Sequence, residues 1–410
     1  MALIVQKYGG TSVGSLDRIK VVAEKVASVH ANGHQMVVVV SAMAGETNRL
    51  FKLAEQLSES PNPRETDVLV ATGEQVSAAL LAIRLRALDC PTVSFLAYQL
   101  KILTDARHGQ ARIKSVECAR LLKALADGNI VVVAGYQGIN EQGDITTLGR
   151  GASDLTAVAL AAVLKAAACE IYTDVDGVYT ADPNICPKAQ RLNRISYDEM
   201  LEMAGLGAKV LQLRSVELAR RYRVPLVVRS SFRDDSEGTW VGEEDRTMED
   251  VLVSGVTLDN NQSKITISGV EDRPGLAARI FGPIADAGIV VDMIIQNASA
   301  DGRADMTFTV ARGDLRRALE LIKMVANEIG ATGIRHEDQV AKVSIIGVGM
   351  RTHAGVAARM FQVLAAESIN IEMIATSEIK ISVVVNTKYG ELAMRALHDS
   401  FLGEASAEAV

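Results

Sequence analysis

A lysine, two glycines and two hydroxyl residues stand together at the end of the first apolar run of the chain. Residues 2–5 have the pattern of a short buried strand, and Lys7-Tyr8-Gly9-Gly10-Thr11-Ser12 follows it closely. Glycines let backbone N–H groups approach a phosphate, and a lysine adds a positive charge. The segment therefore favours an anion-binding loop, although taken alone it is equally compatible with an ordinary Gly-Gly turn.

Four further segments combine glycine or helix starts with charged and hydroxyl side chains. Ser41–Asn48 follows an apolar run and opens a helix, where free N–H groups can bind an anion. Thr72–Glu74 places a carboxylate inside a helical stretch, and Thr147–Asp154 sets an arginine between glycines. Tyr172–Pro183 is a strand end followed by a turn whose acidic and hydroxyl groups suit a sugar hydroxyl or an amine. Read singly, the last three are also explained by a solvated glutamate, helix capping and a structural turn.

The composition limits the classes of protein to which the chain can belong. Its 410 residues suffice for two or three domains, and 48% of them are hydrophobic, as in a soluble α/β protein. A net charge of −7 argues against a nucleic-acid-binding surface. The four cysteines form no CxxC pair, which is typical of buried thiols in a reducing compartment. No signal peptide is evident and the apolar run Leu155–Cys169 indicates a core helix, so we expect a cytoplasmic protein with no membrane or nucleic-acid partner.

Up to about residue 230, apolar runs of strand length alternate with helical patterns. This alternation is typical of a three-layer αβα domain, in which helices cover both faces of a mostly parallel sheet. Ligands of such sheets bind at the carboxyl ends of the strands, where the segments described above occur. We expect strands over residues 36–40, 129–134, 170–173 and 226–228, and helices over residues 16–29, 67–88, 114–126, 153–167 and 208–222.

The C-terminal part contains an internal repeat. Gly275–Phe281 recurs 80 residues later as Gly355–Phe361, and the same offset relates Asp292–Ile294 to Glu372–Ile374. Each copy is predicted to be a ferredoxin-like βαββαβ unit, but the second lacks its last strand. We therefore expect a first domain over residues 1–245, repeats over residues 264–337 and 338–410, and a strand over residues 250–258 that completes the second repeat.

Taken together, these segments resemble the aspartokinases of the amino-acid kinase family. The match covers, in order, Lys7–Ser12, Ser41–Asn48, Gly73-Glu74, Gly149–Asp154, Thr173–Pro183 and Gly207–Val210, and the repeats resemble paired ACT domains. The sequence departs from the family at Ala152, where a second glycine is common, and at Gln212-Leu213, where many members have His-Pro. The resemblance implies transfer of the γ-phosphoryl group of ATP to the side-chain carboxylate of L-aspartate.

The resemblance also implies roles for individual side chains. Lys7 and Asp154 would be catalytic, with Mg²⁺ arriving on ATP, and Glu74 and Arg150 would hold the α-ammonium and α-carboxylate of the substrate. Further substrate contacts are expected from Ser41, Thr47 and Ser153. Nucleotide contacts are expected from Lys7, Tyr8, Gly9, Gly10, Thr173, Asp174, Tyr179, Asp182, Lys209 and Val210.

The ACT repeats imply feedback inhibition by lysine and threonine and assembly into at least a homodimer. Relatives that also make the regulatory half separately suggest Met248 as the start of a second, regulatory subunit. A surface cap or turn explains each candidate effector residue equally well when it is taken singly. These residues are Asp272, Asp292, Gln296 and Asn297 in the first repeat, and Asn370, Thr376, Ser377 and Glu378 in the second.

Two alternatives stay open. The chain could be another amino-acid kinase with a carboxylate or phosphate acceptor, although Glu74 with Arg150 favours an amino acid. It could also be an amino-acid-sensing regulatory protein whose kinase domain is inactive, against which the intact Lys7, Arg150 and Asp154 argue. Turnover of ATP with L-aspartate and with other acceptors would separate these possibilities.

Overall fold

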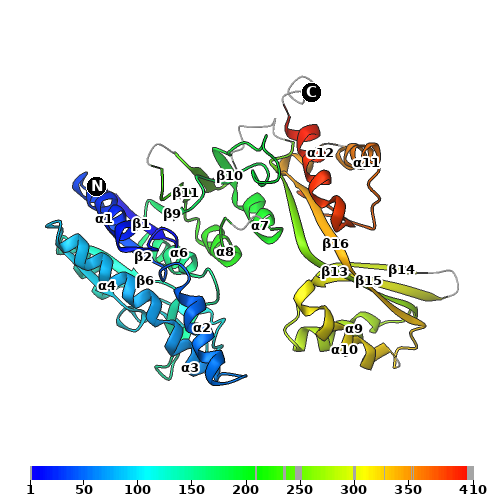
Figure 1. Cartoon of the computed structure of the whole chain (residues 1–410), viewed down its shortest axis with the longest axis horizontal. Helices are drawn as coiled ribbons and strands as arrows, with labels where there is room; N and C mark the ends of the chain where they lie inside the picture. Colours follow the sequence, from blue (N-terminus) through cyan, green and yellow to red (C-terminus); the bar gives the residue numbers. More distant parts are fainter. Residues whose placement is uncertain are drawn as a thin grey trace. The chain divides into compact units, whose positions relative to one another are not determined.

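The computed structural model describes residues 2–207, 210–233, 237–244, 252–298, 302–326, 328–351, 353 and 355–403. These residues form two compact units, and Figure 1 labels many of their elements. The chain passes between the units at several points. The first unit comprises Met1–Tyr179, Arg191–Gly205 and Lys209–Thr247, and the second comprises Thr180–Gln190, Leu206–Ala208 and Met248–Val410.

The first unit is built on an eight-stranded sheet with the order β10-β12-β11-β9-β1-β2-β6-β3. Six strands are parallel, whereas β10 and β12 run the opposite way at one edge. The sheet confirms the predicted α/β class with a mostly parallel sheet. Its strands are β1 (Leu3–Tyr8), β2 (Gln35–Val40), β3 (Thr92–Phe95), β6 (Ile130–Ala134), β9 (Ala168–Thr173), β10 (Arg194–Ser196), β11 (Leu226–Ser230) and β12 (Thr239–Gly242).

Helices cover both faces of this sheet. On one face α1 (Leu16–Ala31) and α4 (Thr72–Arg86) pack against alternate residues of β2, including Met36 and Val38. Val37 and Val39 point to the opposite face, where α6 (Ser153–Leu164) lies against β1, β2 and β9. Both faces of β2 are therefore buried, which explains its uninterrupted run of valines.

The remaining elements of the first unit differ in part from the predicted ones. The helix expected over residues 67–88 is two helices that meet at Ala71, and the one expected over 208–222 begins only at Leu213, where the Gln212 side chain caps it. Residues 113–115 are a strand of a small four-stranded sheet instead of the lead-in to a helix. These elements are α2 (Glu46–Leu57), α3 (Pro63–Val70), η1 (Ala97–Leu100), β4 (Leu103–Thr104), β5 (Ile113–Ser115), α5 (Ala119–Ala126), β7 (Gln137–Ile139), β8 (Ile145–Thr147), α7 (Tyr197–Gly205) and α8 (Leu213–Tyr222).

Among the described residues, one helical stretch has the length and apolar composition of a membrane span. This stretch, Pro63–Arg86, consists of α3 and α4, and half of its most apolar window is buried inside the fold. Gly73, Ser77 and Leu81 lie on that buried side. We interpret the stretch as a pair of core helices.

The second unit is a six-stranded antiparallel sheet with the order β14-β15-β13-β16-β18-β17. Two helices cover each end of it, and each pair has its own apolar core. This confirms the two predicted ferredoxin-like units. The elements are β13 (Gly255–Glu271), α9 (Leu276–Asp286), β14 (Val291–Ala298), β15 (Arg303–Ala311), η2 (Arg312–Asp314), α10 (Leu315–Ala326), β16 (Gly333–Ile346), η3 (Val348–Arg351), α11 (Val356–Ala366), β17 (Met373–Thr376), β18 (Lys380–Asn386), η4 (Thr387–Tyr389) and α12 (Gly390–Leu402).

Two long strands serve both repeats. Residues 255–259 of β13 pair with 342–346 of β16 in the second repeat, and residues 264–268 pair with 333–337 in the first. Figure 1 shows both strands running from the α11–α12 pair to the α9–α10 pair. The strand expected over residues 250–258 thus begins at Gly255 and continues to Glu271, while residues 250 and 251 lie outside the described part of the chain.

The segment Thr180–Gln190 packs in the second unit, although it follows the Tyr172–Tyr179 turn of the first. Its Ala181 and Cys186 are buried in the apolar core under α11 and α12. The Thr180 carbonyl accepts the Val256 N–H at 2.7 Å, and its hydroxyl lies 2.9 Å from His398 Nε2. Sequence reasoning had treated this segment as part of the first domain.

Candidate active site

The end of β1 and the start of α6 bring a lysine and an aspartate together. Lys7 Nζ lies 2.7 Å from Asp154 Oδ1, and both side chains are about nine-tenths buried. Asp154 is in the first turn of α6, where unpaired N–H groups and the helix dipole favour negative charge. The pair places a cation beside a helix N-terminus, which is an arrangement suited to a phosphoryl group.

The loops after β1 and β2 pack against the start of α4 without room for side chains. A Cβ atom on Gly10 would lie 2.9 Å from the Ala42 carbonyl oxygen, and one on Gly73 would lie 2.8 Å from the Ala42 side chain. The Gly9 N–H donates to the Tyr172 carbonyl at 3.1 Å. Glycine at these positions therefore allows three segments distant in sequence to converge.

Tyr8 has a different environment from the one its predicted nucleotide role suggests. Its ring is fully buried and stacks on Tyr172 with centroids 4.7 Å apart. Its hydroxyl donates to Gln6 Oε1 at 3.1 Å, inside the core. The side chain of Tyr8 therefore packs the sheet, and only its backbone is available to a nucleotide.

Glu74 is a buried carboxylate in the first turn of α4, with an exposed fraction of 3%. Oε1 accepts the Ala42 N–H at 3.0 Å, whereas no hydrogen-bond donor reaches Oε2 from the described residues. Burial raises the pKa of Glu74 to about 7, and the backbone hydrogen bonds offset this only in part. A bound ammonium group would supply the missing donor and the compensating charge.

Arg150 stands on the glycine loop between β8 and α6. Gly149 and Gly151 on either side have φ of +96° and +78°, which glycine adopts without strain. The Arg150 side chain is exposed, and its Nη2 donates to Asn48 Oδ1 at 3.0 Å. Ser153 is buried at the start of α6, so close to Gly135 that a Cβ there would lie 2.8 Å from the Ser153 Cβ.

Tyr136 connects these substrate candidates, and the sequence analysis missed it. The residue is buried and has φ of +69°, a conformation that is strained for a bulky side chain and concentrates at functional sites. Burial is the main cause that raises the pKa of its phenol, and the charges of Glu74, Asp67 and Arg150 also act on it. Ser41 and Thr47, both half-buried, lie on the neighbouring loop and on α2.

The nucleotide candidates are less closely grouped. Thr173 ends β9, and its hydroxyl donates to Asp174 Oδ1 at 3.1 Å. The Tyr179 hydroxyl donates to Asp176 Oδ1 at 2.7 Å, and this hydrogen bond is the main cause that raises the pKa of Tyr179. Asp182 belongs to the second unit, Val210 is half-buried in the first, and Lys209 lies outside the described residues.

One serine beside this region, Ser231, was also missed by sequence reasoning. Ser231 Oγ donates to the Thr173 carbonyl at 3.1 Å and lies 2.8 Å from Ser12 Oγ, which belongs to the opening glycine segment. Arg18 donates to the Ser231 carbonyl and lies over the Phe232 ring. The turn after β11 therefore borders the ends of β1 and β9.

The structure brings some of the effector candidates together. Gln296 Nε2 donates to Asp272 Oδ1 at 3.1 Å in the first repeat. Asn297, Asn370, Thr376, Ser377 and Glu378 are exposed, and Asp292 forms an ion pair with Lys342.

Reciprocal ion pairs join the two repeats. Asp292 of the first repeat pairs with Lys342 on β16, and Glu372, its counterpart in the second, accepts from Lys264 Nζ on β13 at 2.6 Å. Lys342 has an exposed fraction of 3%, and the Lys264 side chain one of 12%. Each acidic residue is thus neutralised by a lysine from the first strand of the other repeat.

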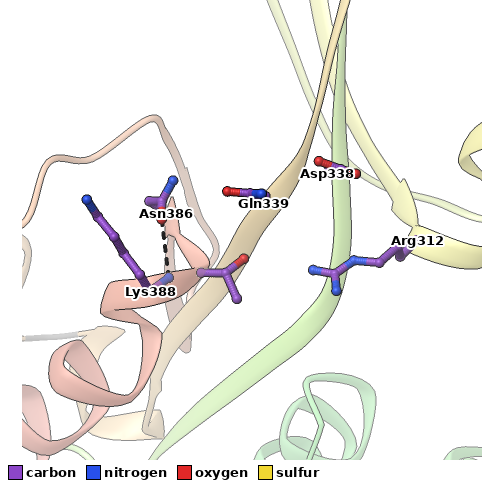
Figure 2. A pocket seen from close by; sticks show the side chains of 6 residues that line it. Arg312, Asp338, Gln339, Asn386 and Lys388 are labelled. Carbon is purple, nitrogen blue, oxygen red and sulfur yellow. Dashed lines mark hydrogen bonds between the residues drawn. The ribbon is translucent and has the colours of Figure 1, made fainter.

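A shallow hollow of about 490 Å³ lies where the two repeats meet (Figure 2). It contains none of the predicted effector residues. Figure 2 shows Asn386 and Lys388 on one side and Arg312 on the other, with Asp338 and Gln339 between them on β16. Its lining residues are Arg312, Asp338, Gln339, Asn386, Thr387 and Lys388.

Family models match three parts of the chain. The amino acid kinase family matches residues 2–230, and ACT domains match residues 265–326 and 343–401. The chain therefore belongs to the amino acid kinase family and carries two ACT domains.

Full-length relatives narrow this assignment. The chain is 55% identical over 407 residues to an aspartate kinase of Stutzerimonas stutzeri, covering 99% of both chains. It is also similar to two crystal structures of Escherichia coli aspartokinase III, each 29% identical. The complex with aspartate and ADP has a TM-score of 0.81, with 97% of this chain and 99% of that one covered; the complex with lysine and aspartate has a TM-score of 0.75, with 98% and 99% covered. Within its family the chain groups with the aspartokinases, as the sequence segments predict.

Proposed function

We propose that the protein transfers the γ-phosphoryl group of ATP to the side-chain carboxylate of L-aspartate, forming 4-phospho-L-aspartate and ADP. This reaction would begin the biosynthesis of lysine, threonine and methionine. The observation that carries the proposal is the buried carboxylate of Glu74, whose Oε2 no hydrogen-bond donor of the described residues reaches and which can therefore hold an ammonium group. The exposed Arg150 would hold the α-carboxylate of the same amino acid. The full-length similarity to aspartate kinases supports the same substrate.

The chemistry needs no general base. The acceptor carboxylate is already ionised at neutral pH, so one of its oxygens can attack the γ-phosphorus directly. The bond from the γ-phosphorus to the β–γ bridging oxygen breaks, and ADP leaves. Alignment and neutralisation of the crowded negative charge are therefore the tasks of the protein.

Lys7 and Asp154 would perform the second task. The Lys7 ammonium group would contact the transferred phosphoryl group, while Asp154, 2.7 Å from it, holds the lysine in place. The N–H groups at the start of α6 add positive potential. Ser41, Thr47 and Ser153 would supply hydroxyl contacts to the substrates.

The nucleotide would lie along the ends of β1 and β9. Thr173, Asp174, Tyr179 and the backbone of residues 8–10 would contact it, and Lys209 and Val210 are further candidates. The described residues contain no group of three His, Cys, Asp or Glu side chains that could hold a metal ion alone. Mg²⁺ prefers oxygen ligands and keeps several of its waters, so it would be held mainly by the phosphates of ATP and by water. A carboxylate such as that of Asp174 fits this preference for oxygen.

An acceptor assay tests this proposal. The protein is incubated with ATP and L-aspartate, L-glutamate, N-acetyl-L-glutamate or phosphate, and hydroxylamine traps any acyl phosphate as a hydroxamate. We expect ADP and hydroxamate with L-aspartate in excess of every other acceptor. Turnover with another acceptor alone would identify a different amino-acid kinase, and no turnover with any of them would favour a sensor with an inactive kinase domain.

We further propose that the second unit mediates inhibition by lysine and threonine. The complex of E. coli aspartokinase III with lysine supports lysine as an effector. The contact between Asp272 and Gln296 gives the first repeat a polar group suited to an amino acid. Inhibition curves with each amino acid and with both together would test this, and insensitivity to all three conditions would reject it.

The same unit would assemble the protein into at least a dimer. Its edge strands β14 and β17 expose Ile294 and Ile374, which are equivalent positions of the two repeats, to 52% and 42%. Open edges with exposed apolar side chains favour association. Light scattering after gel filtration would measure the mass, and a monomer at micromolar concentration would contradict the proposal.

Two more features of the organisation are proposals. We take residues 1–245 as the kinase domain, except for Thr180–Gln190, which packs in the second unit. We take residues 264–337 and 338–410 as the ACT domains, and the pairing of 255–259 with 342–346 supports completion of the second ACT domain by the preceding strand. We place the protein in the cytoplasm. Met248, the candidate start of a separate subunit, lies outside the described residues, and expression with a tag at each end would reveal or exclude a fragment that begins there.

A further inference from the structure

Asp67 is a buried carboxylate for which the proposed reaction has no direct use. It lies on α3 with an exposed fraction of 1%. Oδ1 accepts the Thr147 hydroxyl at 2.5 Å, and Oδ2 lies 2.8 Å from His108 Nδ1. Both oxygens lie 3.1 Å from the Gly109 N–H. A buried carboxylate with this many partners fixes the groups around it strongly.

The partners of Asp67 belong to two loops that converge from different parts of the chain. His108 and Gly109 lie between β4 and β5, and Thr147 ends β8, three residues before Arg150. The Ala111 N–H donates to the Thr147 carbonyl at 2.9 Å. The cluster therefore ties the start of the Arg150 loop to a second loop and to α3.

Arg214 ties the same two loops from another side. Its Nη1 donates to the Leu148 carbonyl at 2.5 Å, and its Nη2 donates to the Ala111 carbonyl at 2.8 Å. Beyond these anchors the chain has two glycines with positive φ, at 149 and 151, and little intrinsic stiffness. The direction in which Arg150 points therefore depends on how firmly residues 147 and 148 are held.

The Asp67 cluster also borders the candidate substrate region. The Tyr136 carbonyl accepts the Leu148 N–H at 2.9 Å, and the Tyr136 side chain is buried in the same apolar cluster as Leu148 and Ala152. Asp67 itself has its oxygens occupied by Thr147, His108 and Gly109, so it acts through them.

We propose that Asp67, oriented by His108, is a positioning residue that fixes Thr147 and thereby the loop carrying Arg150. It would set how tightly the protein holds the α-carboxylate of the acceptor amino acid. This inference rests on the proposed function, because it uses Arg150 as the group that binds that carboxylate.

Steady-state kinetics of Thr147→Val and Asp67→Asn test the proposal. Loss of a hydrogen bond to a buried charged group weakens binding by about 10- to 100-fold. We expect the KM for L-aspartate to rise by this factor in both variants, with the KM for ATP changed less than about threefold. Thr147→Ser, which keeps the hydroxyl, should restore a KM near that of the unmodified protein.

Thr146→Val is the matched control. Its hydroxyl is also buried on β8, but it lies 2.7 Å from Thr104 Oγ1 instead of contacting Asp67. Loss of a buried hydroxyl alone would affect Thr146→Val and Thr147→Val similarly. The double variant Asp67→Asn/Thr147→Val should have a KM for L-aspartate no higher than that of the worse single variant, because both changes remove the same contact. Additive losses, or equal rises in both KM values, would overturn the proposal.

Hydrogen exchange separates failure of this inference from failure of the proposed function. Measured without substrates, Thr147→Val should increase amide exchange at residues 147–152 and leave β1 and β2 unchanged. Unaltered exchange at residues 147–152 would overturn the inference even in an active enzyme. Increased exchange together with no aspartate turnover by the unmodified protein would refute the proposed substrate while leaving the anchoring of the loop established.

Discussion

Replacement of Glu74 by glutamine should change the stability of the first unit in a pH-dependent way. Burial raises the pKa of this carboxyl from 4.5 to about 7 in the folded protein. The folded state therefore binds the proton more tightly than the unfolded state. As the pH rises from about 4.5 to about 7, Glu74 lowers the free energy of unfolding, because the carboxylate charge is more stable in water, in the unfolded chain, than buried in the folded protein.

The size of the effect follows from the shift. One pKa unit corresponds to about 1.4 kcal/mol, so the penalty on the ionised form is roughly 3 kcal/mol above pH 7. Part of that penalty is already present at pH 5. The difference in free energy of unfolding between Glu74→Gln and the unmodified protein should therefore rise by roughly 2.5 kcal/mol between pH 5 and pH 8, in favour of the variant.

Urea denaturation followed by tryptophan fluorescence measures this difference. Trp240 is the single tryptophan and lies on β12, so its emission reports unfolding of the first unit. Glu55→Gln, an exposed glutamate of α2, is the control and should follow the unmodified protein at both pH values. If the free energies of unfolding of Glu74→Gln and the unmodified protein differ by the same amount at pH 5 and pH 8, Glu74 is not a charge kept buried for a cationic ligand.

Three further changes test the assigned roles. Lys7→Ala should lower kcat by roughly 100-fold or more, since it removes a cation from the transferred phosphoryl group, while the tryptophan emission shows that the variant is folded. Replacement of the exposed Lys20 by alanine is the control, and a near-normal kcat in Lys7→Ala would reject the role of Lys7. Arg150→Met should raise the KM for L-aspartate and leave the KM for ATP unchanged, as initial-rate measurements would show. A raised KM for ATP with an unchanged KM for L-aspartate would contradict the role of Arg150. Ser377→Phe should weaken inhibition by lysine with threonine by about 5- to 150-fold, relative to the uninhibited rate of the variant. An unchanged inhibition curve would place the effector site elsewhere.

The sequence was most informative where residue type alone limits the chemistry. A lysine followed by glycines and hydroxyl residues at a strand end favoured an anion-binding loop, and the family resemblance implied that Lys7 and Asp154 act together. The structure brings these two residues to 2.7 Å. Glu74 illustrates a weaker inference. Its surroundings in sequence favour a solvated helix residue, and only the packing of α4 against the Ala42 loop shows a buried carboxylate. Burial of this kind depends on segments that are 32 residues apart and have no local signal.

Asp67 and Tyr136 could not be found from the sequence. Asp67 resembles any polar residue of an amphipathic helix, and its partner Thr147 is 80 positions away. Tyr136 follows an apolar strand, and nothing in its neighbourhood announces a positive φ. Several predicted boundaries of helices and strands were wrong for a related reason. The 17-residue β13 crosses two repeats because both of its halves find partners on β16, a long-range pairing that no local pattern specifies.

The location of Thr180–Gln190 has a consequence for how this gene can be divided. A fragment that stops before residue 248 would retain this stretch but lose the strands and helices under which Ala181 and Cys186 are buried. It would expose apolar side chains and would be prone to aggregate. A chimaera that exchanges the regulatory half with that of a relative would need the donor sequence at residues 180–190 as well as after residue 247. Compatibility between the halves is therefore encoded in separate stretches of the gene, which recombination at a single crossover cannot transfer together.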